Sequence, residues 1–326
     1  MSLLEQCRAR CRAAPKRIVF ADAMDTRILQ AANTLRAEGL AEPIVVGNPF
    51  ALRDYAGKNG MSTPCLSVVA PEHSGHLGTF AEAFKVASGA SLSDTSAHES
   101  MRDPLFYAAM MVNQGHADIC IAGNLSTTGD VIRAALQVIG VAEEHRTVSS
   151  FFMMVSADGK DTRLFADAGV VPQPTVEQLA EITIDAARSF EYLTGEKARV
   201  AMLSFSTKGS SDHPAALHVR QAFEQVRRRA PQLLVDGELQ LDAAVVPSVA
   251  QIKAPESPLQ GRSNVLIFPS LNAGNIAYKV AQRLCNYAAL GPLLAGLKKP
   301  MHDLSRGCTA DEVVDIAVLA SCLVEH

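Results

Sequence analysis

The sequence predicts an α/β protein whose sheets are mainly parallel. Short apolar segments at 17–20, 43–47 and 66–69 alternate with segments of helical periodicity. Apolar strands of this kind are typical of a parallel sheet that helices cover on both faces. With 326 residues, of which 48% are hydrophobic and 20% charged, the chain is long enough to form two domains.

The same alternation continues along the chain. Further helices are expected around 29–35 and at 50–58, 103–114, 175–192 and 313–323, and further strands at 118–122, 199–205 and 264–269. Pro104 suits the first turn of the helix at 103–114. The segments 147–155 and 163–167 are expected to pair as strands through a turn at Asp158-Gly159.

Polar loops that lead into helices recur in the sequence. The first is 123–130, and its helix carries apolar residues at 132, 135, 136 and 139. Similar loops occupy 206–211 and 272–275, and the turn Ser305-Arg306-Gly307 adds a fourth before the last helix. Glycine and hydroxyl side chains at a helix N-terminus are suited to binding a phosphate or another anion.

Several classes of enzyme site are missing from the sequence. It contains no GxG, no GxxxxGK[ST], no HExxH and no GxSxG pattern, and no Cys/His group at zinc spacing. The remaining candidates are hydroxyls, amides and a few arginines. Such groups suit charge stabilisation on a phosphate or acyl phosphate, and no metal is expected.

Each polar loop also has a purely structural interpretation. Ser126, Thr127 and Thr128 could cap the following helix, and Arg133 could be a surface residue. Asn272 and Asn275 could serve turn geometry alone. The histidines are isolated in the sequence, so each is interpreted as structural.

The sharpest conflict concerns Glu312. Thr309 and Glu312 form the S/T-x-x-E pattern of a capping box immediately before an apolar helix. This explains Glu312 structurally, and the preceding Asp311 suits the helix dipole. A catalytic role for either carboxylate has to be weighed against that explanation.

Charge and cysteine usage limit the partners and the compartment. The net charge is −4 and the pI is about 6.1, and the basic triplet Arg227–Arg229 is interpreted as a solvated helix end, so nucleic acid is not expected. The seven cysteines are scattered without a CxxC pair, which favours free thiols in a reducing compartment. No apolar run reaches the roughly 18 residues of a membrane span, and a soluble cytoplasmic protein is expected.

Long motifs in the chain resemble those of the phosphate acetyltransferases (phosphotransacetylases). They are GNLSTTGDVIRAALQVIG at 123–140, VAMLSFSTKGS at 200–210, DGELQLDAAVVP at 236–247, NVLIFPSLNAGNIAYKVAQRL at 264–284 and KPMHDLSRGCTADEVV at 299–314. The resemblance extends from about Arg17 to the end. RIVFADAMDTRIL, VVPQP and MHDLSRG resemble the ethanolamine-utilisation type in particular.

The resemblance implies a fold and a reaction. The fold consists of two α/β/α domains, isocitrate/isopropylmalate dehydrogenase-like, at 1–142 and 143–299, with 300–326 returning to the first domain and the active site in the interdomain cleft. The reaction is acetyl-CoA + phosphate ⇌ CoA + acetyl phosphate. Coenzyme A is then a substrate, no cofactor is tightly bound, and the protein is a homodimer.

The resemblance also implies residue roles. Ser305 lies near the CoA thiol, and Arg306 and Arg133 bind the phosphate and the developing charge. The family's general base is an Asp seven residues after the serine. Here that position is Glu312, with Asp311 beside it. The predicted substrate-binding residues are Asn124, Ser126, Thr127, Thr128, Arg133, Ser150, Lys208, Asn272 and Asn275.

Two positions depart from the family pattern. Ala168 stands where the family often has Cys, so no cysteine nucleophile is offered there and direct attack of the CoA thiolate in a ternary complex is expected. A family arginine near 80–89 has no counterpart. Lys85 is the nearest cation, and a lysine cannot reproduce a bidentate contact.

Other interpretations remain open. The substrate could be a propionyl or butyryl rather than an acetyl group. A metal- and NAD-dependent dehydrogenase could share the architecture, although the sequence contains no cluster of metal-binding aspartates. A non-catalytic, regulatory acetyl-CoA-binding module is a further alternative. An N-terminal amphipathic segment with Leu3, Leu4, Cys7 and Cys11 could dock to a bacterial microcompartment shell or be a plain surface helix.

Overall fold

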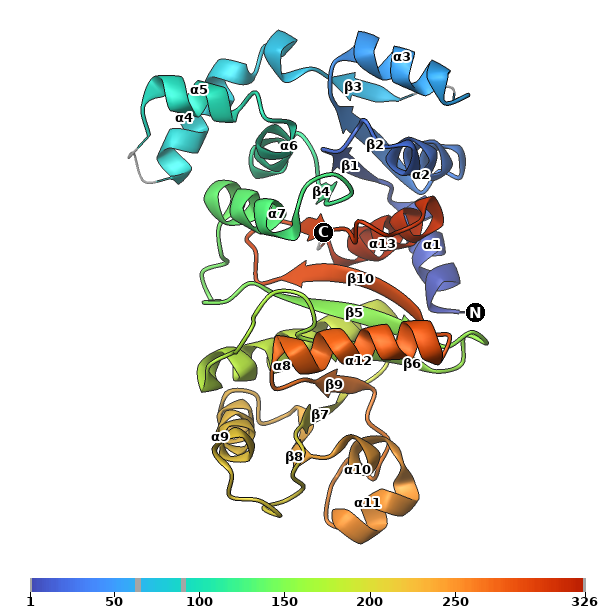
Figure 1. Cartoon of the computed structure of the whole chain (residues 1–326), viewed down its shortest axis with the longest axis vertical. Coiled ribbons are helices and arrows are strands. Elements are labelled where there is room, and N and C mark those ends of the chain that lie inside the picture. Colours follow the sequence, from blue (N-terminus) through green and yellow to red (C-terminus); the bar gives the residue numbers. More distant parts are fainter. Residues whose placement is uncertain (1, 62–65, 89–91, 325–326) are drawn as a thin grey trace. The chain divides into compact units, whose positions relative to one another are not determined.

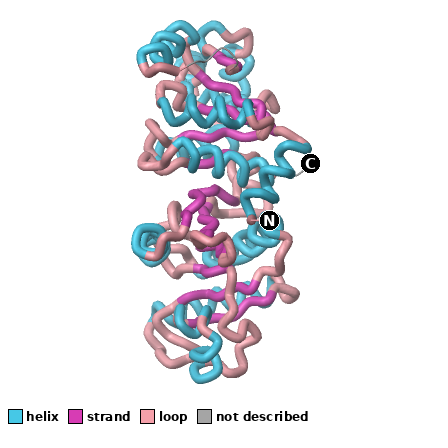
Figure 2. The backbone as a smooth tube through the Cα atoms, turned by 90° about the vertical axis from the view of Figure 1, so that its right-hand side faces the viewer, coloured by secondary structure: helices cyan, strands magenta, loops and turns pink. Residues whose placement is uncertain are grey.

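The computed structural model describes residues 2–61, 66–88 and 92–324. These residues form two compact units, which Figure 1 colours along the sequence. Unit 1 comprises Leu3–Glu143 and the chain from Leu297 onward, and unit 2 comprises Glu144–Gly296 together with Ser2. Each unit has strands flanked by helices, drawn in magenta and cyan in Figure 2. The α/β prediction with mainly parallel sheets is confirmed.

Unit 1 is built on a five-stranded sheet in the order β11-β4-β1-β2-β3, in which every neighbouring pair is parallel. Its strands are β1 (Lys16–Phe20), β2 (Ala41–Val46), β3 (Ser67–Val69), β4 (Ile119–Ala122) and β11 (Met301–Asp303). Its helices are α1 (Leu3–Ala13), α2 (Thr26–Ala37), α3 (Pro49–Lys58), η1 (Pro71–His73), α4 (Leu77–Ala87), α5 (Asp94–Ser100), α6 (Pro104–Asn113), α7 (Thr128–Ala134), the π-turn η2 (Ala135–Ile139) and α13 (Ala310–Leu323).

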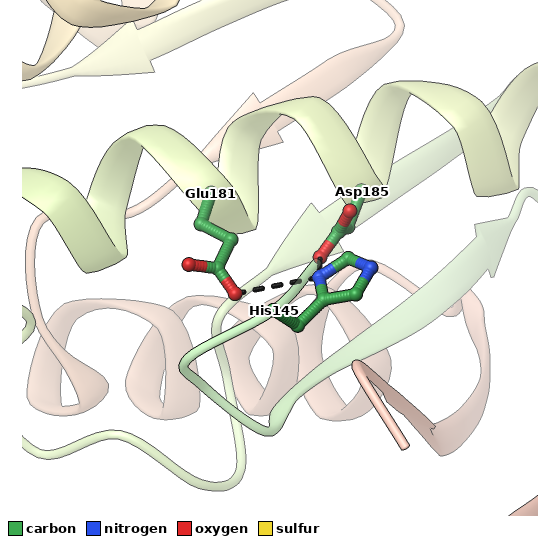
Figure 3. Close-up of side chains that lie close together, drawn as sticks. All are labelled: His145, Glu181 and Asp185. Atoms are coloured by element: carbon green, nitrogen blue, oxygen red, sulfur yellow. Dashed lines mark ion pairs between the residues drawn. The ribbon is translucent and has the colours of Figure 1, made fainter. Parts of the chain in front are cut away.

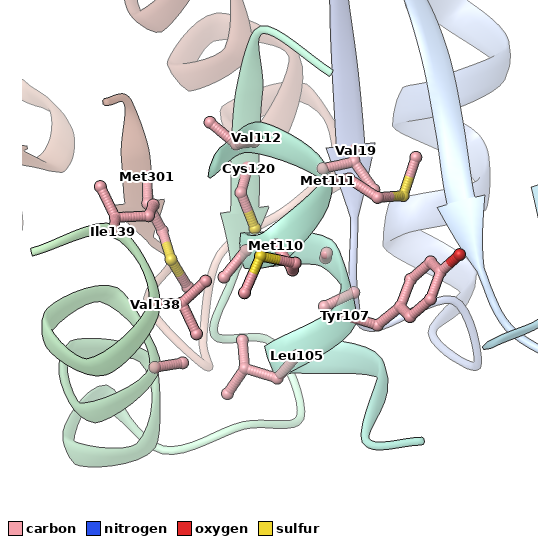
Figure 4. Close-up of a cluster of buried hydrophobic side chains, with 14 of the residues drawn as sticks. Val19, Leu105, Tyr107, Met110, Met111, Val112, Cys120, Val138, Ile139 and Met301 are labelled. Carbon is pink, nitrogen blue, oxygen red and sulfur yellow. The ribbon is translucent and has the colours of Figure 1, made fainter. Parts of the chain in front are cut away.

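Helices cover both faces of this sheet. Successive side chains of a strand point to opposite faces, and in β1 Val19 joins the apolar cluster under α4, α6 and α7. Figure 4 shows part of that cluster, with Met110 of α6 beside Cys120 of β4. On the other side of the sheet α13 packs against α1 and α2. The helices that follow β1 and β4, α2 and α7, therefore lie on different faces of the sheet.

Unit 2 is built on a six-stranded mixed sheet in the order β10-β5-β6-β9-β7-β8. The pairs β10/β5 and β5/β6 are antiparallel, and the other pairs are parallel. The strands are β5 (Ser149–Val155), β6 (Thr162–Ala166), β7 (Arg199–Leu203), β8 (Leu234–Leu239), β9 (Val265–Ile267) and β10 (Ala288–Ala295). The helices are α8 (Val176–Thr194), α9 (Pro214–Arg229), α10 (Leu241–Val245), α11 (Pro247–Lys253) and α12 (Leu271–Leu284).

The N-terminal segment corrects one expectation. It is a helix, α1, but Cys7 and Cys11 are 0% and 2% exposed. Cys11 Sγ lies 3.5 Å from the carbonyl oxygen of Val318, and Cys322 Sγ lies 3.6 Å from that of Cys7. The apolar face of α1 is therefore packed on α13 and is not free to dock to a shell.

The expectations for the cysteines, for Arg227–Arg229 and for membrane spans agree with the structure of the described residues. The six cysteines within the described ranges are free thiols, and Cys65 lies outside those ranges. Arg227–Arg229 are exposed in the last turn of α9. Among the described helices, none combines the length and the hydropathy that a membrane crossing requires.

Candidate active site

Three loops of unit 1 converge at one edge of its sheet. They follow β1, β4 and β11, which are adjacent and parallel, so their carboxyl ends meet at this edge. The loop after β1 carries Asp22 and Asp25, that after β4 is 123–127, and that after β11 is 304–309. The loop after β1 leads to a helix on one face and that after β4 to a helix on the other. Such a switch point is where α/β sheets bind ligands.

Asp22 holds the loop after β4 in place. Its Oδ2 accepts hydrogen bonds from the backbone N–H groups of Gly123 at 2.7 Å, Asn124 at 2.9 Å and Leu125 at 3.3 Å. Its Oδ1 accepts one from the Ser126 hydroxyl at 3.0 Å. Because the Asp22 side chain is buried, these four donors have an acceptor that water does not displace.

Arg27 holds the loop after β11. Its Nη1 donates to the carbonyl oxygens of Arg306 at 2.7 Å and Cys308 at 2.9 Å. Its Nη2 lies 2.6 Å from Asp25 Oδ2. Burial opposes ionisation of Asp25, but the hydrogen bonds from Arg27 outweigh it and lower the pKa of that carboxyl. The turn that carries Ser305 and Arg306 is thus anchored through its backbone.

The loops after β4 and β11 are also joined directly. Thr128 Oγ1 donates to Asp303 Oδ2 at 2.7 Å, and Cys308 Sγ lies 3.5 Å from Asn124 Oδ1. Gly123 has φ +119°, and a Cβ there would lie 2.3 Å from Asp303 Oδ1 and 2.6 Å from the Leu304 nitrogen. Only glycine therefore permits this approach of the two loops.

Asp303 is a buried carboxyl at this junction. It is 2% exposed, and within the described residues its Oδ1 has no hydrogen-bond partner. Burial raises the pKa of Asp303 to about 6. A carboxyl in this state exchanges a proton close to neutral pH, which is the range that proton transfer in catalysis requires.

We expect Asp303→Asn to change the pH dependence of unfolding. An exposed Asp has a pKa near 3.9, so the unfolded chain releases this proton at a lower pH than the folded protein does. As the pH rises from roughly 4 to 6, the free energy of unfolding of the wild type therefore falls by about 2–3 kcal/mol. The asparagine variant has no carboxyl at this position, so its free energy of unfolding should not show this decrease. Urea unfolding followed by circular dichroism, which suits a chain without tryptophan, measures the difference. A difference between the two proteins that is constant from pH 4 to 7 contradicts the assignment.

The turn itself presents side chains to solvent. Ser305, Arg306 and Gly307 are exposed, while the neighbouring Leu304 and Cys308 are buried. Ser305 Oγ accepts a hydrogen bond from the Gly307 N–H at 3.4 Å. The guanidinium of Arg306 is therefore displayed by a turn whose backbone is fixed on both sides.

Glu312 forms the capping box that its spacing predicts. Its Oε2 accepts from the Thr309 N–H at 2.8 Å, and Thr309 Oγ1 accepts from the Glu312 N–H at 3.2 Å. Asp311 is exposed in the same first turn of α13. The two carboxylates thus lie five and six residues beyond Arg306, in the first turn of α13.

The first turn of α7 also has a structural explanation. Thr127 Oγ1 accepts from the Asp130 N–H at 3.2 Å and caps the helix. Arg133 pairs with Asp130 and its side chain is 58% exposed. A hydrogen bond from Thr127, with the nearby Arg133, lowers the pKa of Asp130. Arg133 can exchange this intrahelical partner for a ligand at little cost, because exposed pairs are weak.

The remaining predicted residues belong to unit 2. Ser150 is 1% exposed, and its hydroxyl donates to Asp167 Oδ1 at 2.5 Å. Asn275 Nδ2 donates to the Ala168 carbonyl oxygen at 3.2 Å. Both side chains therefore support the loop after β6, while Asn272 is exposed at the start of α12.

Lys208 and Lys85 are each paired with carboxylates. Lys208 has a positive φ of 49°, forms an ion pair with the buried Asp236 and lies over the Phe223 ring in unit 2. Lys85 of α4 pairs with Asp94 and lies 3.6 Å from Glu82. Of the predicted residues in unit 1, Asn124, Ser126, Thr127, Ser305 and Arg306 stand in the loops after β4 and β11, Thr128 begins α7, and Asp311 and Glu312 stand in the first turn of α13.

Sequence reasoning did not identify the residues that position these loops. Asp22, Arg27 and Asp303 lie within the motifs RIVFADAMDTRIL and MHDLSRG, but the sequence assigns them no role, and their partners in the other loops are 101 to 281 residues away in the chain. The one available signal was that Asp22 and Asp303 each stand at the carboxyl end of an apolar or strand-like segment. In a parallel sheet, such positions meet at one edge.

Known proteins resemble this chain over its full length. Residues 2–321 match the phosphate acetyl/butaryl transferase family. A phosphate acetyltransferase of Treponema pallidum is 41% identical over 333 residues, which are 99% of this chain and 98% of the relative.

Solved structures agree with that likeness. A phosphotransacetylase from Streptococcus pyogenes superposes with a TM-score of 0.93 at 36% identity, and the EutD phosphotransacetylase from Staphylococcus aureus with 0.91 at 34%. In both cases the match covers 99% of this chain and 98% of the other. The sequence profile, the full-length relative and the folds all agree, and the chain belongs to the phosphate acetyl/butaryl transferase family.

Proposed function

We propose that the protein transfers an acetyl group between coenzyme A and phosphate, forming CoA and acetyl phosphate from acetyl-CoA and phosphate. The observation that carries this proposal is the exposed Ser305-Arg306 turn, which Arg27 and β11 fix at the switch point of the sheet in unit 1. Family membership supports the same reaction. The predicted dehydrogenase and regulatory-module alternatives receive no support from the relatives.

In the proposed mechanism the CoA thiolate attacks the carbonyl carbon of acetyl phosphate. The C–S bond forms, the C–O bond to phosphate breaks, and phosphate leaves with the electron pair. Arg306 and Arg133 offset the charge on the carbonyl oxygen and on the departing phosphate. One well-placed donor of this kind contributes about 3 kcal/mol to transition-state binding.

Ser305 and the loop after β4 position the substrates. Ser305 is placed next to the CoA sulfur, and Asn124, Ser126, Thr127 and Thr128 bind phosphate oxygens. An ordinary alkyl thiol has a pKa near 8.5, so raising the thiolate fraction to near unity at pH 7 contributes about 2 kcal/mol. A carboxylate of modest basicity is sufficient. The candidate carboxyls are Glu312, Asp311 and the buried Asp303.

We expect Glu312→Gln to separate capping from catalysis. Glutamine still completes a capping box, but it cannot accept the thiol proton. The variant should therefore keep its melting temperature. In the direction that forms acetyl-CoA from CoA and acetyl phosphate, it should lose about tenfold to thirtyfold in kcat at pH 7, a deficit that shrinks as the pH approaches the thiol pKa of about 8.5. Steady-state kinetics from pH 6.5 to 9 measure this.

Asp311→Asn is the matched control for that experiment. It removes the neighbouring exposed carboxylate and leaves the capping box in place. If Glu312→Gln retains wild-type kcat while Asp311→Asn does not, Glu312 is a cap and the base is Asp311.

Four residues of unit 2 complete the proposed substrate-binding set. Lys208 supplies a positive charge, and Asn272 and Asn275 supply amides at the start of α12. Ser150 contributes indirectly, because its hydroxyl fixes Asp167 and thereby the backbone near Asn275. We further propose that the chain forms two domains, 1–142 and 143–299, with 300–326 belonging to the first.

The protein is also proposed to act as a homodimer. Three apolar side chains spaced four residues apart on α12 are exposed: Ile276 by 63%, Val280 by 45% and Leu284 by 79%. An aligned apolar surface of this kind favours contact with a second copy. Sedimentation velocity should give a dimer for the wild type and a smaller species for Val280→Asp, whereas a monomeric wild type at micromolar concentration contradicts the proposal.

The same likeness supports a proposal about the cellular setting. We propose a cytoplasmic enzyme of ethanolamine utilisation, since one matching structure is a EutD phosphotransacetylase. Packaging in a bacterial microcompartment is part of this proposal, although it requires a surface other than the apolar face of α1. Propionyl and butyryl groups are the alternative substrates, as the family description includes a second acyl group.

One assay tests the main proposal. The purified protein is mixed with acetyl-CoA and phosphate, and loss of the thioester absorbance is followed against samples lacking phosphate. We expect phosphate-dependent release of CoA and an equal amount of acetyl phosphate. Binding of acetyl-CoA without turnover supports the regulatory alternative and overturns the proposal.

A further inference from the structure

A second group of chemically active side chains lies in unit 2. His145 stands in the segment that leads into β5, and Glu181 and Asp185 stand on α8 (Figure 3). The two carboxylates are four residues apart, so they project from one face of the helix. Figure 3 shows both of them turned toward the imidazole of His145.

The spacing of the three side chains fits a coordination sphere. His145 Nδ1 lies 3.0 Å from Asp185 Oδ2 and 3.3 Å from Glu181 Oε1. All the potential ligand atoms lie within 4.8 Å of one another. Two ligands that are each about 2.1 Å from an ion lie roughly 3.0 Å apart at an octahedral angle and roughly 3.4 Å apart at a tetrahedral one.

The group contains polar atoms that the surrounding protein does not satisfy. His145 Nδ1 is buried and, despite its two close oxygens, makes no properly aligned hydrogen bond among the described residues. The hydroxyl of Thr147 is likewise buried without a partner there, and Thr147 is 6% exposed. Its own N–H donates to Glu181 Oε1 at 3.2 Å, so the backbone of Thr147 adjoins the cluster. Each buried polar group without a partner requires an explanation, and a bound ion supplies one for His145 Nδ1.

Charge balance favours a cation in this position. The side chains of His145, Glu181 and Asp185 are 13%, 6% and 10% exposed. Two carboxylates held this close in a buried place repel one another, and one imidazole neutralises at most one of them. The charges of Arg188 and Arg229 also act on Asp185, but among the described residues neither arginine forms an ion pair with it. The Arg146 N–H, 2.7 Å from Glu181 Oε1, fixes the orientation of that carboxylate, as outer partners of metal ligands do.

We propose that His145, Glu181 and Asp185 bind one divalent transition-metal ion per chain. One imidazole and two carboxylates suit Mn²⁺ and Zn²⁺, with Thr147 and water available for the remaining positions. The ion joins the segment entering β5 to α8 and stabilises unit 2. It takes no part in the proposed acetyl transfer, so the two proposals are tested separately.

The test uses Mn²⁺, for which the thiols of the chain compete less than they do for Zn²⁺. The full-length protein is dialysed against a chelator and titrated with Mn²⁺, and free Mn²⁺ is measured by electron paramagnetic resonance. We expect one bound ion per chain and a higher melting temperature. Asp185→Asn and His145→Gln should each weaken binding at least tenfold.

Glu177→Gln provides the matched control. Glu177 is an exposed carboxylate one turn before Glu181 on α8, and its removal should leave Mn²⁺ binding unchanged. Circular dichroism of the metal-free variants establishes that each is folded. If the wild type does not bind Mn²⁺, or if folded Asp185→Asn binds it as tightly as Glu177→Gln does, the proposal is wrong.

Discussion

Replacing Arg306 with alanine is expected to lower kcat/KM at least a hundredfold in a protein that remains folded. A hundredfold loss corresponds to about 2.7 kcal/mol of transition-state binding, which is the contribution of one well-placed donor to a developing oxyanion. The fold should survive because the side chain is exposed and Arg27 binds the backbone carbonyl of residue 306, which alanine retains. Steady-state kinetics of the thioester assay, together with thermal unfolding, measure both effects.

Two further variants make this result specific. Arg306→Lys keeps the charge but cannot form a bidentate contact, so it should recover only part of the activity. Arg228→Ala removes another exposed arginine, from α9 of unit 2, and should leave kcat/KM unchanged. Full activity of Arg306→Ala, or its failure to fold, would count against the assigned role.

Replacing Asp22 with alanine is expected to cost at least about 3 kcal/mol in the free energy of unfolding. The substitution leaves the N–H groups of Gly123, Asn124 and Leu125 and the Ser126 hydroxyl without their acceptor. Hydrogen bonds to a charged group contribute about 1.5–3 kcal/mol each, and buried donors without a partner add a desolvation cost. We also expect kcat/KM to fall, since the loop after β4 then loses its fixed position.

Asp22→Asn should be much milder. Its oxygen can accept the three N–H groups and its amide can donate to the Ser126 oxygen, so the same contacts can persist with weaker bonds. Asp54→Ala serves as the control, because it removes an exposed carboxylate of α3 whose partner is Lys58. Urea unfolding by circular dichroism compares the three variants, and an Asp22→Ala protein as stable as Asp54→Ala would refute the role of Asp22.

The parts of the fold that the sequence predicts are those with local causes. Capping and periodicity determine α6, α8 and α12, and the Thr309–Glu312 spacing predicts a capping box that the structure contains. Alternation of apolar strands and helices predicts a mainly parallel sheet. All of these depend on residues within one turn or one strand of each other.

The parts that sequence reasoning missed depend on distant partners. β11 has only three residues, Met301–Asp303, and becomes a strand by pairing with β4, some 180 positions earlier. The helix face predicted to be apolar, with residues 132, 135, 136 and 139, is not buried as a whole. A π-helix at 135–139 changes the direction of these side chains and leaves Leu136 44% exposed. Local patterns cannot indicate such tertiary effects.

The candidate site likewise contains residues that the sequence indicates and residues that only the folded structure identifies. Ser305, Arg306 and the hydroxyls of 126–128 stand out as motifs, whereas Asp22 and Arg27 act only through contacts that the folded chain creates. The structural interpretations of two of these residues are also confirmed, because Thr127 caps α7 and Arg133 pairs with Asp130 at the helix surface. A residue can thus satisfy a local structural rule and remain available to a ligand.

The return of the chain to unit 1 has a consequence for synthesis on the ribosome. Translation completes residues 144–296 of unit 2 before it produces β11 and α13 of unit 1. Until then β4 is an open sheet edge, and Arg27 lacks the carbonyl oxygens of Arg306 and Cys308 as partners. Ser305 and Arg306 are therefore added to the site only near the end of synthesis. A polypeptide truncated before Leu297 should resemble an incomplete folding intermediate that depends on chaperones.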